Sequence, residues 1–140
     1  MSVNGGRILA FDWGLRNIGV AVGNAVLKTA EPCTVIKAKD GVPAWSDIER
    51  LIGDWQPQLL LVGEPINMDG SDSDMAARAR RFARKLEGRF GIAVTLVDER
   101  LSSQEAKIQR RDRGGSTDYA SQPVDAEAAC VILSTWLSDN

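Results

Sequence analysis

Acidic side chains occur where predicted secondary-structure elements begin or end, and these residues are the best candidates for chemistry in the sequence: Asp12, Glu64, Asp98, Glu99 and Asp125. Side chains at the ends of buried strands are held rigidly, which is why sites are often built there. If three such carboxylates converge, their repulsion is costly unless a cation neutralises it. Ligands that offer oxygen alone suit a hard divalent ion, Mg²⁺ or Mn²⁺. The pattern therefore predicts metal-assisted hydrolysis of a phosphodiester bond.

The chain contains no histidine. This absence excludes Ser-His and Cys-His dyads, histidine metal ligands and the usual base at neutral pH. Cys33 and Cys130 lie far apart in the sequence, each within an apolar run. Their spacing does not fit a metal knuckle or a redox pair, and it favours two thiols packed in the core.

Most of these acidic positions also have a purely structural interpretation. Asp125 precedes an apolar helical run and is a candidate N-cap. Asp98 and Glu99 are candidate surface partners of Arg100, and since adjacent strand residues point to opposite faces, at most one of the two should line a given site. Asp12 stands between Phe11 and Trp13 in a predicted central strand, where a carboxylate needs a partner. Function is therefore the stronger interpretation for Asp12.

Basic residues are concentrated in one part of the chain. The segment 78–113 has eleven lysines and arginines against five acidic residues, which is +6, and since the whole chain carries −2, the remainder carries −8. Such segregation is typical of proteins that bind nucleic acid on one face, although solvated helix faces give the same pattern. The candidate contacts to phosphate are Arg78, Arg81, Lys85, Arg89, Arg100, Lys107, Arg110, Arg111 and Arg113.

The first half of the chain predicts strands followed by a helix. Residues 7–13 and 17–23 are short apolar runs separated by a turn, as in a hairpin, and residues 32–36 predict a third strand before a break at Gly41 and Pro43. Apolar residues at helical spacing predict a helix over 45–55. Its tryptophans, Trp45 and Trp55, are interpreted as core anchors in preference to a platform for stacking bases.

The second half predicts strands alternating with helices. Residues 59–63 and 93–97 are continuous apolar runs typical of buried strands. Between them, a cap at Asp72 or Ser73 starts a helix that ends at Gly91. A capping box starts a further helix over 102–111, residues 113–123 form a loop with Gly114, Gly115 and Tyr119, and the last helix covers 124–137.

The length of 140 residues and the ordinary balance of apolar and charged residues predict a single folded domain over 1–140. The elements predict an α/β fold, a mixed sheet covered by helices on both faces. No apolar stretch is long enough for a membrane span, and the start lacks the features of a signal peptide. We therefore expect a soluble, cytoplasmic protein that does not associate with membranes.

Four motifs in this order, FDWGLRNIGVAVG, VGEPINMDGSDS, VDERLSSQEA and VDAEAACVIL, span positions 11–133. As a set they resemble the YqgF (RuvX) family of RNase H-like proteins, which is associated with Holliday junction resolution and with pre-16S rRNA processing. The resemblance implies an RNase H-like fold with a five-stranded mixed sheet, its first three strands antiparallel, and helices on both faces. It also implies a metal-dependent nuclease that trims the 5′ end of pre-16S ribosomal RNA.

The resemblance assigns roles to individual residues. Asp12 matches the family's acid in the first strand, Glu99 the second acid and Asp125 the acid of the last helix, so all three are candidate catalytic residues and ligands of Mg²⁺ or Mn²⁺. Glu64 departs from the family, which usually has an apolar residue there. It is either a fourth ligand or a local substitution, and we favour the substitution. Asp98 is a further candidate ligand.

Other functions remain compatible with the sequence. Actin-like phosphotransfer also begins with an Asp-x-Gly hairpin, but it needs two domains and a second phosphate motif. A Holliday junction resolvase would need two sites on a dimer, and a non-catalytic RNA-binding factor in ribosome assembly would keep the fold and the basic face. We expect nucleic acid as the partner, pre-rRNA rather than branched DNA, and a monomer or weak homodimer.

Overall fold

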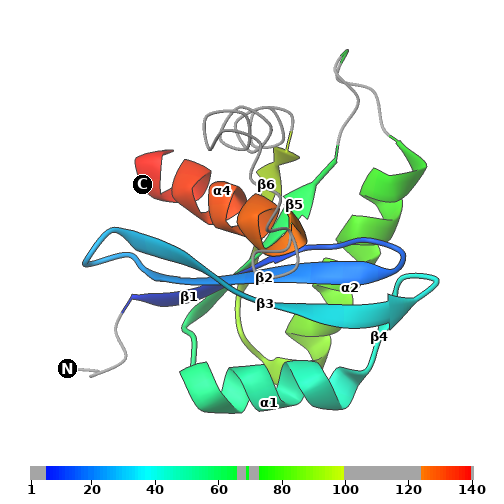
Figure 1. Cartoon of the computed structure of the whole chain (residues 1–140), viewed down its shortest axis with the longest axis horizontal. Coiled ribbons are helices and arrows are strands. Elements are labelled where there is room, and N and C mark those ends of the chain that lie inside the picture. Colours follow the sequence, from blue (N-terminus) through cyan, green and yellow to red (C-terminus); the bar gives the residue numbers. More distant parts are fainter. Residues whose placement is uncertain (1–5, 66–68, 70–72, 100–123, 140) are drawn as a thin grey trace.

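The computed structural model describes residues 6–65, 69, 73–99 and 124–139, which form a mixed α/β fold (Figure 1). In chain order the elements are β1 (Arg7–Asp12), β2 (Asn17–Asn24), β3 (Thr29–Lys39), β4 (Val42–Pro43), α1 (Trp45–Trp55), β5 (Leu59–Glu64), α2 (Asp74–Phe90), β6 (Val94–Asp98) and α4 (Val124–Asp139). The predicted α/β class is confirmed. The helix expected over 102–111 and the loop over 113–123 lie outside the described residues.

The strands form one sheet in the order β4-β3-β2-β1-β5-β6. Strands β1 to β3 pair antiparallel, and β5 and β6 continue the sheet in parallel with β1. This confirms a mixed sheet whose first three strands are antiparallel. Strand β1 is central, so its carboxyl end is flanked by a strand on either side.

The sheet has six strands where five were expected, because the break predicted at Gly41 and Pro43 is a tight turn that returns the chain to β3. Asp40 (φ +51°) and Gly41 (φ +82°) both adopt the left-handed conformation. Val42 and Pro43 then pair with Lys39 and Ala38 as β4. An Asp-Gly pair is a strong hairpin signal, and it was the sign of this short strand in the sequence.

Strand β3 is longer than the predicted 32–36 segment. A register shift opposite Val20 and Ala21 places Thr34 and Pro32 across from them, so Cys33 between these two is the extra residue of a bulge. A bulge tolerates proline, which cannot donate to a regular ladder. Pro32 therefore lies within the strand and does not begin it.

The helices begin and end where local signals place them. Helix α1 has the predicted bounds, and Gln56 ends it in the left-handed conformation (φ +48°). Ser73, one of the two predicted caps, accepts a hydrogen bond from the Ala76 backbone N–H at 2.9 Å and begins α2. Gly91 ends α2 at φ +67°, as predicted.

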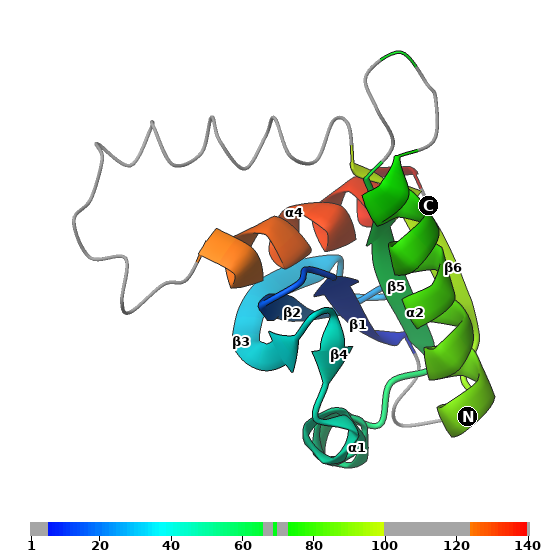
Figure 2. The same cartoon turned by 90° about the vertical axis from the view of Figure 1, so that its right-hand side faces the viewer.

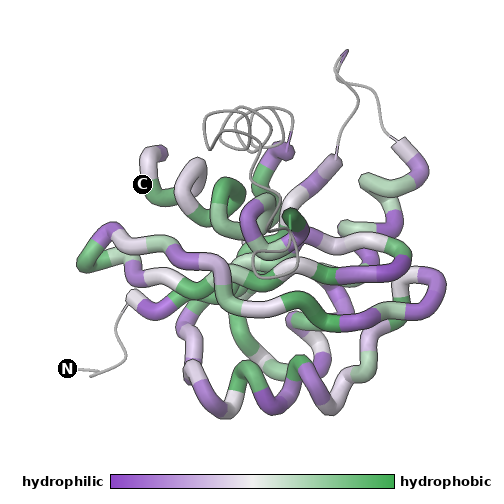
Figure 3. The backbone as a smooth tube through the Cα atoms, viewed as in Figure 1, coloured by the Kyte–Doolittle hydropathy of each residue, from purple (hydrophilic) through white to green (hydrophobic). Residues whose placement is uncertain are grey.

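Two hydrophobic cores lie on opposite faces of the sheet. Leu9 and Phe11 of β1 pack toward α1 and α2, whereas Ile8 and Ala10 pack toward α4. Figures 1 and 2 show α4 on one face of the curled sheet and α1 and α2 on the other. In Figure 3 the central strands are mostly hydrophobic, while α1 alternates along its turns as an amphipathic helix does. The predicted covering of both faces is thus confirmed.

Within the described residues neither cysteine forms a disulfide, and both are half-buried, Cys33 beside the core under α1 and α2 and Cys130 beside the core under α4. Burial raises the pKa of the Cys33 thiol. Both thiols therefore pack against apolar surface, as predicted. Within the described residues, no helix has the length and apolar character needed to cross a membrane.

Candidate active site

Asp12 ends the central strand β1 and points to the α4 face of the sheet. Its place follows from the alternation of β1, where Ile8 and Ala10 already face α4. Burial is the main cause that raises the pKa of Asp12 well above its usual range, and the charges of Glu99 and Asp125 add to it. The carboxyl group is thus positioned by the most constrained strand of the fold, beside two other acids.

Gly19 allows the start of α4 to reach this point. Gly19 pairs with Asp12 across β1 and β2. A Cβ atom on Gly19 would overlap the backbone carbonyl of Asp125, so the first turn of α4 rests directly on the β2 backbone. Asp125 is therefore placed next to the end of β1 by backbone packing.

Glu99 approaches Asp12 from the other side. It follows β6 directly and its residue is only 8% exposed. A Cβ atom on Gly63 would lie 2.7 Å from both Cγ and Cδ of Glu99, so the Glu99 side chain crosses the β5 backbone at this glycine. Gly19 and Gly63 together leave the space that the two outer acids occupy.

Asp12 and Glu99 share a hydrogen bond between their carboxyl groups. This bond raises the pKa of Asp12 and partly offsets the rise that burial causes in the pKa of Glu99. Adjacent carboxyl groups raise one another's pKa values, because ionising both would place two negative charges side by side. The pair is therefore suited to exchange its proton for a metal ion.

The donor set fits a hard divalent ion in its chemistry. Asp12, Glu99 and Asp125 offer carboxylate oxygens, the ligands that Mg²⁺ and Mn²⁺ prefer. Across the described ranges, no three acidic or thiol side chains already stand in the arrangement that holds a metal ion. Asp125 acts on Asp12 through charge, whereas Glu99 makes direct contact. Asp12, Glu99 and Asp125 are the residues that would hold such an ion.

Glu64 and Asp98 lie on the other face of the sheet. Glu64 accepts a 2.7 Å hydrogen bond from Arg80 of α2, within an ion pair whose side chains are 18% and 25% exposed. Asp98 pairs in register with Glu64, so its side chain leaves the sheet on the same side. The structure thus separates both residues from Asp12, which points toward α4. The local-substitution interpretation of Glu64 accounts for this position.

Replacing Glu64 by leucine should leave metal dependence unchanged. Because Glu64 contacts Arg80 and not the Asp12 carboxyl, a Mn²⁺ titration of activity for Glu64→Leu should overlay that of the wild type. Loss of a charged hydrogen bond should lower stability modestly, by about 1–2 kcal/mol. A higher metal requirement for the variant would instead make Glu64 a ligand.

The predicted phosphate-binding residues fall in two groups. Arg78, Arg81, Lys85 and Arg89 all lie on α2, on the face of the sheet that Asp12 does not face. The structure therefore does not bring them together with the carboxylates. The other candidates lie outside the described residues: Arg100, Lys107, Arg110, Arg111 and Arg113.

Comparison with known proteins decides the family. The family model described as RuvX, Holliday junction resolvase, matches residues 6–139. The chain belongs to the RuvX family. A RuvX relative from Marinobacter nauticus, named "Putative pre-16S rRNA nuclease", is 50% identical over 130 residues, which are 93% of this chain and 91% of the relative. A relative of the same name from Sodalis glossinidius is 50% identical over 132 residues, 94% of each chain.

Solved structures confirm the RNase H-like fold of this RuvX-family chain. Thermus thermophilus RuvC in complex with a Holliday junction substrate matches with a TM-score of 0.55 at 15% identity, over 95% of this chain and 94% of that one. The fowlpox virus resolvase in complex with Holliday junction DNA matches with a TM-score of 0.52 at 11% identity, over 95% and 97%. At these identities the likeness establishes the fold.

Sequence reasoning missed the two glycines that make room for the RuvX carboxylates. Gly19 belongs to the quoted FDWGLRNIGVAVG motif and Gly63 ends the apolar run of β5, so both were visible. Their role required the strand register, which places Gly19 opposite Asp12 and Gly63 opposite Val97. A glycine beside a strand-end acid is the signal that such a site gives in a sequence.

Proposed function

We propose that this chain is a metal-dependent nuclease that hydrolyses phosphodiester bonds and matures the 5′ end of pre-16S rRNA. The observation that carries the proposal is the convergence of Asp12, Glu99 and the start of α4 at the end of the central strand. Relatives that are half identical over more than nine tenths of the chain are named for pre-16S rRNA. RNA is therefore preferred to a DNA junction as the substrate.

The residues of the site have different roles. Asp12, Glu99 and Asp125 would hold Mg²⁺ or Mn²⁺, which supplies an activated water and stabilises the leaving oxygen when bound. Asp12 is fixed by β1, so it sets the position of the scissile phosphate. Glu99 and Asp125 approach it from either side. Asp12 and Glu99 would give up their shared proton when an ion binds. The glycines Gly19 and Gly63 keep both approaches open.

The wider setting follows from this function. We place the protein in the cytoplasm, where ribosomal RNA is processed, with nucleic acid as its partner and the whole chain working as one nuclease domain. A monomer suffices for trimming a single RNA end. Symmetric cleavage of a four-way junction would need a second copy of the site.

A direct comparison of substrates tests the proposal. Purified protein is incubated with a 16S precursor carrying its 5′ extension and, separately, with a four-way DNA junction, each with Mn²⁺ or with EDTA. We expect Mn²⁺-dependent shortening of the RNA and an intact junction. Cleavage of the junction alone would make the protein a resolvase. Binding of RNA with no cleavage of either would make it a binding factor.

A further inference from the structure

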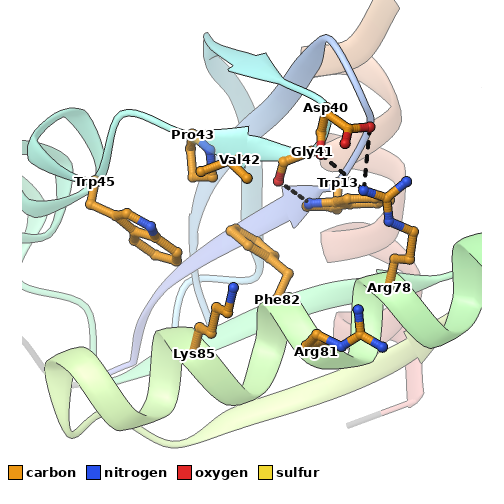
Figure 4. Close-up of a pocket in the computed structure, with 10 residues that line it drawn as sticks. All are labelled: Trp13, Asp40, Gly41, Val42, Pro43, Trp45, Arg78, Arg81, Phe82 and Lys85. Atoms are coloured by element: carbon orange, nitrogen blue, oxygen red, sulfur yellow. Dashed lines mark hydrogen bonds and ion pairs between the residues drawn. The ribbon is translucent and has the colours of Figure 1, made fainter.

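A cavity of about 70 Å³ lies on the face of the sheet that packs against α1 and α2, between α2 and the β3–β4 turn. Figure 4 shows the residues that line it, which combine aromatic rings with three basic side chains: Trp13, Asp40, Gly41, Val42, Pro43, Trp45, Arg78, Arg81, Phe82 and Lys85. The carboxylate site does not include any of them. The cavity is therefore a separate feature of the fold.

At one end of the cavity, the lining residues hold one another in place. The Trp13 indole Nε1 donates to the Gly41 carbonyl at 2.9 Å, and a Cβ atom on Gly41 would overlap the indole ring. Arg78 lies 5.4 Å from the centre of the Trp13 ring and donates to the Asp40 carbonyl oxygen at 2.9 Å. Its guanidinium also meets the Asp40 carboxylate at 3.5 Å. The guanidinium of Arg78 thus stabilises the β3–β4 turn.

At the other end of the cavity, aromatic rings form the wall, and other side chains already pack on them. Trp45 stacks on Phe82 with ring centroids 5.8 Å apart, and the Arg89 guanidinium carbon lies 4.3 Å from the Trp45 ring centre. The tryptophan is therefore a core anchor, as predicted, and its ring is already packed. A nucleobase would have to displace Arg89 or Phe82 to stack there.

Arg81 and Lys85 are the cations of the lining that remain for a ligand. Within the described part of the chain neither of them makes an ion pair or a hydrogen bond. In Figure 4 Lys85 extends from α2 toward the gap between Trp45 and Phe82. Since Asp40 offsets Arg78, the lining retains a surplus of two positive charges.

The size of the cavity selects a small anion. A volume of 70 Å³ corresponds to about five water-sized positions at roughly 10–15 Å³ each, and a phosphate group has five heavy atoms. Two cations that make no ion pair with any described residue lie at this cavity and attract a phosphate, which lysine and arginine bind well.

We propose that Arg81 and Lys85 bind one backbone phosphate of the RNA substrate in this cavity, away from the bond that is cut. The inference rests on the proposed nuclease function. Trp13 of the cavity directly follows Asp12 of the carboxylate site, and the two side chains lie on opposite faces of the sheet. An RNA strand that passes around the end of β1 can therefore contact both.

Binding of fluorescently labelled single-stranded RNA in EDTA, at several salt concentrations, tests this phosphate site without cleavage. The double variant Arg81→Ala/Lys85→Ala should bind more weakly, with the slope of log K against log salt reduced by about 0.7 for one lost phosphate. Arg84→Ala is the matched control, because Arg84 is an exposed cation of the same helix that does not line the cavity. Its slope should stay close to that of the wild type.

A loss in Arg84→Ala of about half that in the double variant, as expected when each removed charge counts equally, would reveal a diffuse positive field and overturn the inference. A second variant, Val42→Glu, places a carboxylate at the exposed mouth of the cavity and should weaken binding with little change in folding. The variants should bind RNA with a 5′-phosphate and RNA with a 5′-hydroxyl more weakly by the same factor. Weaker binding of the 5′-phosphate RNA alone would assign the site to the terminal phosphate and exclude a backbone phosphate.

The two proposals can fail separately. A normal salt slope in the double variant, with Mn²⁺-dependent cleavage intact, would overturn the phosphate site alone. A changed slope in a protein whose wild type cuts no RNA would overturn the nuclease function and leave the site as an RNA contact.

Discussion

Asp12→Asn is expected to reduce Mn²⁺-dependent cleavage to the level seen in EDTA while raising the stability of the metal-free protein. The loss of activity follows because Asp12 is the acid of the central strand, in contact with Glu99 and within the field of Asp125. The gain in stability follows because the amide keeps the shape of the side chain and removes a buried charge beside two like charges. Asp125→Asn should abolish cleavage in the same way.

The pH dependence of this effect has a definite sign. Burial holds the pKa of Asp12 in the folded protein above its unfolded value, so the protonated carboxyl favours folding. This stability is fully present below the unfolded pKa and is lost as the pH rises through the folded pKa. The advantage of Asp12→Asn in the absence of metal should therefore grow with rising pH.

Thermal unfolding in EDTA across a pH series measures this advantage. In a chain of this length, a gain of about 1 kcal/mol raises Tm by roughly 2–4 °C. Added Mn²⁺ should then stabilise the wild type more than the variant. A variant that cuts normally, or one that is less stable than the wild type at every pH, would remove Asp12 from the site.

Gly19→Ala is expected to have the second largest effect. The new Cβ would overlap the Asp125 carbonyl, so the first turn of α4 must move away from β2. Overpacking of this kind costs about 1–3 kcal/mol. A displacement of about 1 Å in a catalytic group can cost roughly a hundredfold in rate, so activity should fall by that order while the protein still folds.

Matched glycines in α1 and α2 provide the control. Gly53 and Gly88 have nothing within 4 Å of an added Cβ, and alanine at either position should raise stability by about 0.5–1 kcal/mol with full activity. Cleavage rates and Tm values for the three alanine variants separate misplacement of Asp125 from a general effect of substituting glycine. Full activity in Gly19→Ala would show that α4 need not rest on β2.

The sequence predicted most of the fold because its local signals agree with the tertiary structure. The apolar spacing of Trp45–Trp55 yields the bounds of α1, and Ser73 and Gly91 cap α2 as read. The acid of β1 was identified because a carboxylate in an apolar strand lacks a local explanation. By contrast, Pro32 does not mark the start of β3, because a bulge accommodates it within the strand.

The remaining features depend on which face each side chain occupies, and that requires the register between strands. Asp12 ends β1 and Glu64 ends β5, the parallel neighbour of β1. Glu64 nevertheless contacts Arg80 of α2, whereas Asp12 faces α4 on the other side of the sheet. The helical spacing of Arg78, Arg81, Lys85 and Arg89 indicated one basic stripe. The structure divides it, because Arg78 and Arg89 pack over tryptophan rings that lie far away in sequence.

The central position of β1 has a consequence for how this protein can lose its function. Strand β1 is bonded to a neighbour on both edges and carries a core on both faces. Such a strand exposes its amides to hydrogen exchange only when the whole domain opens. The strand end that bears Asp12 therefore cannot melt by itself. A substitution deep in the core under α1 and α2 will therefore lower activity mainly by reducing the population of folded molecules.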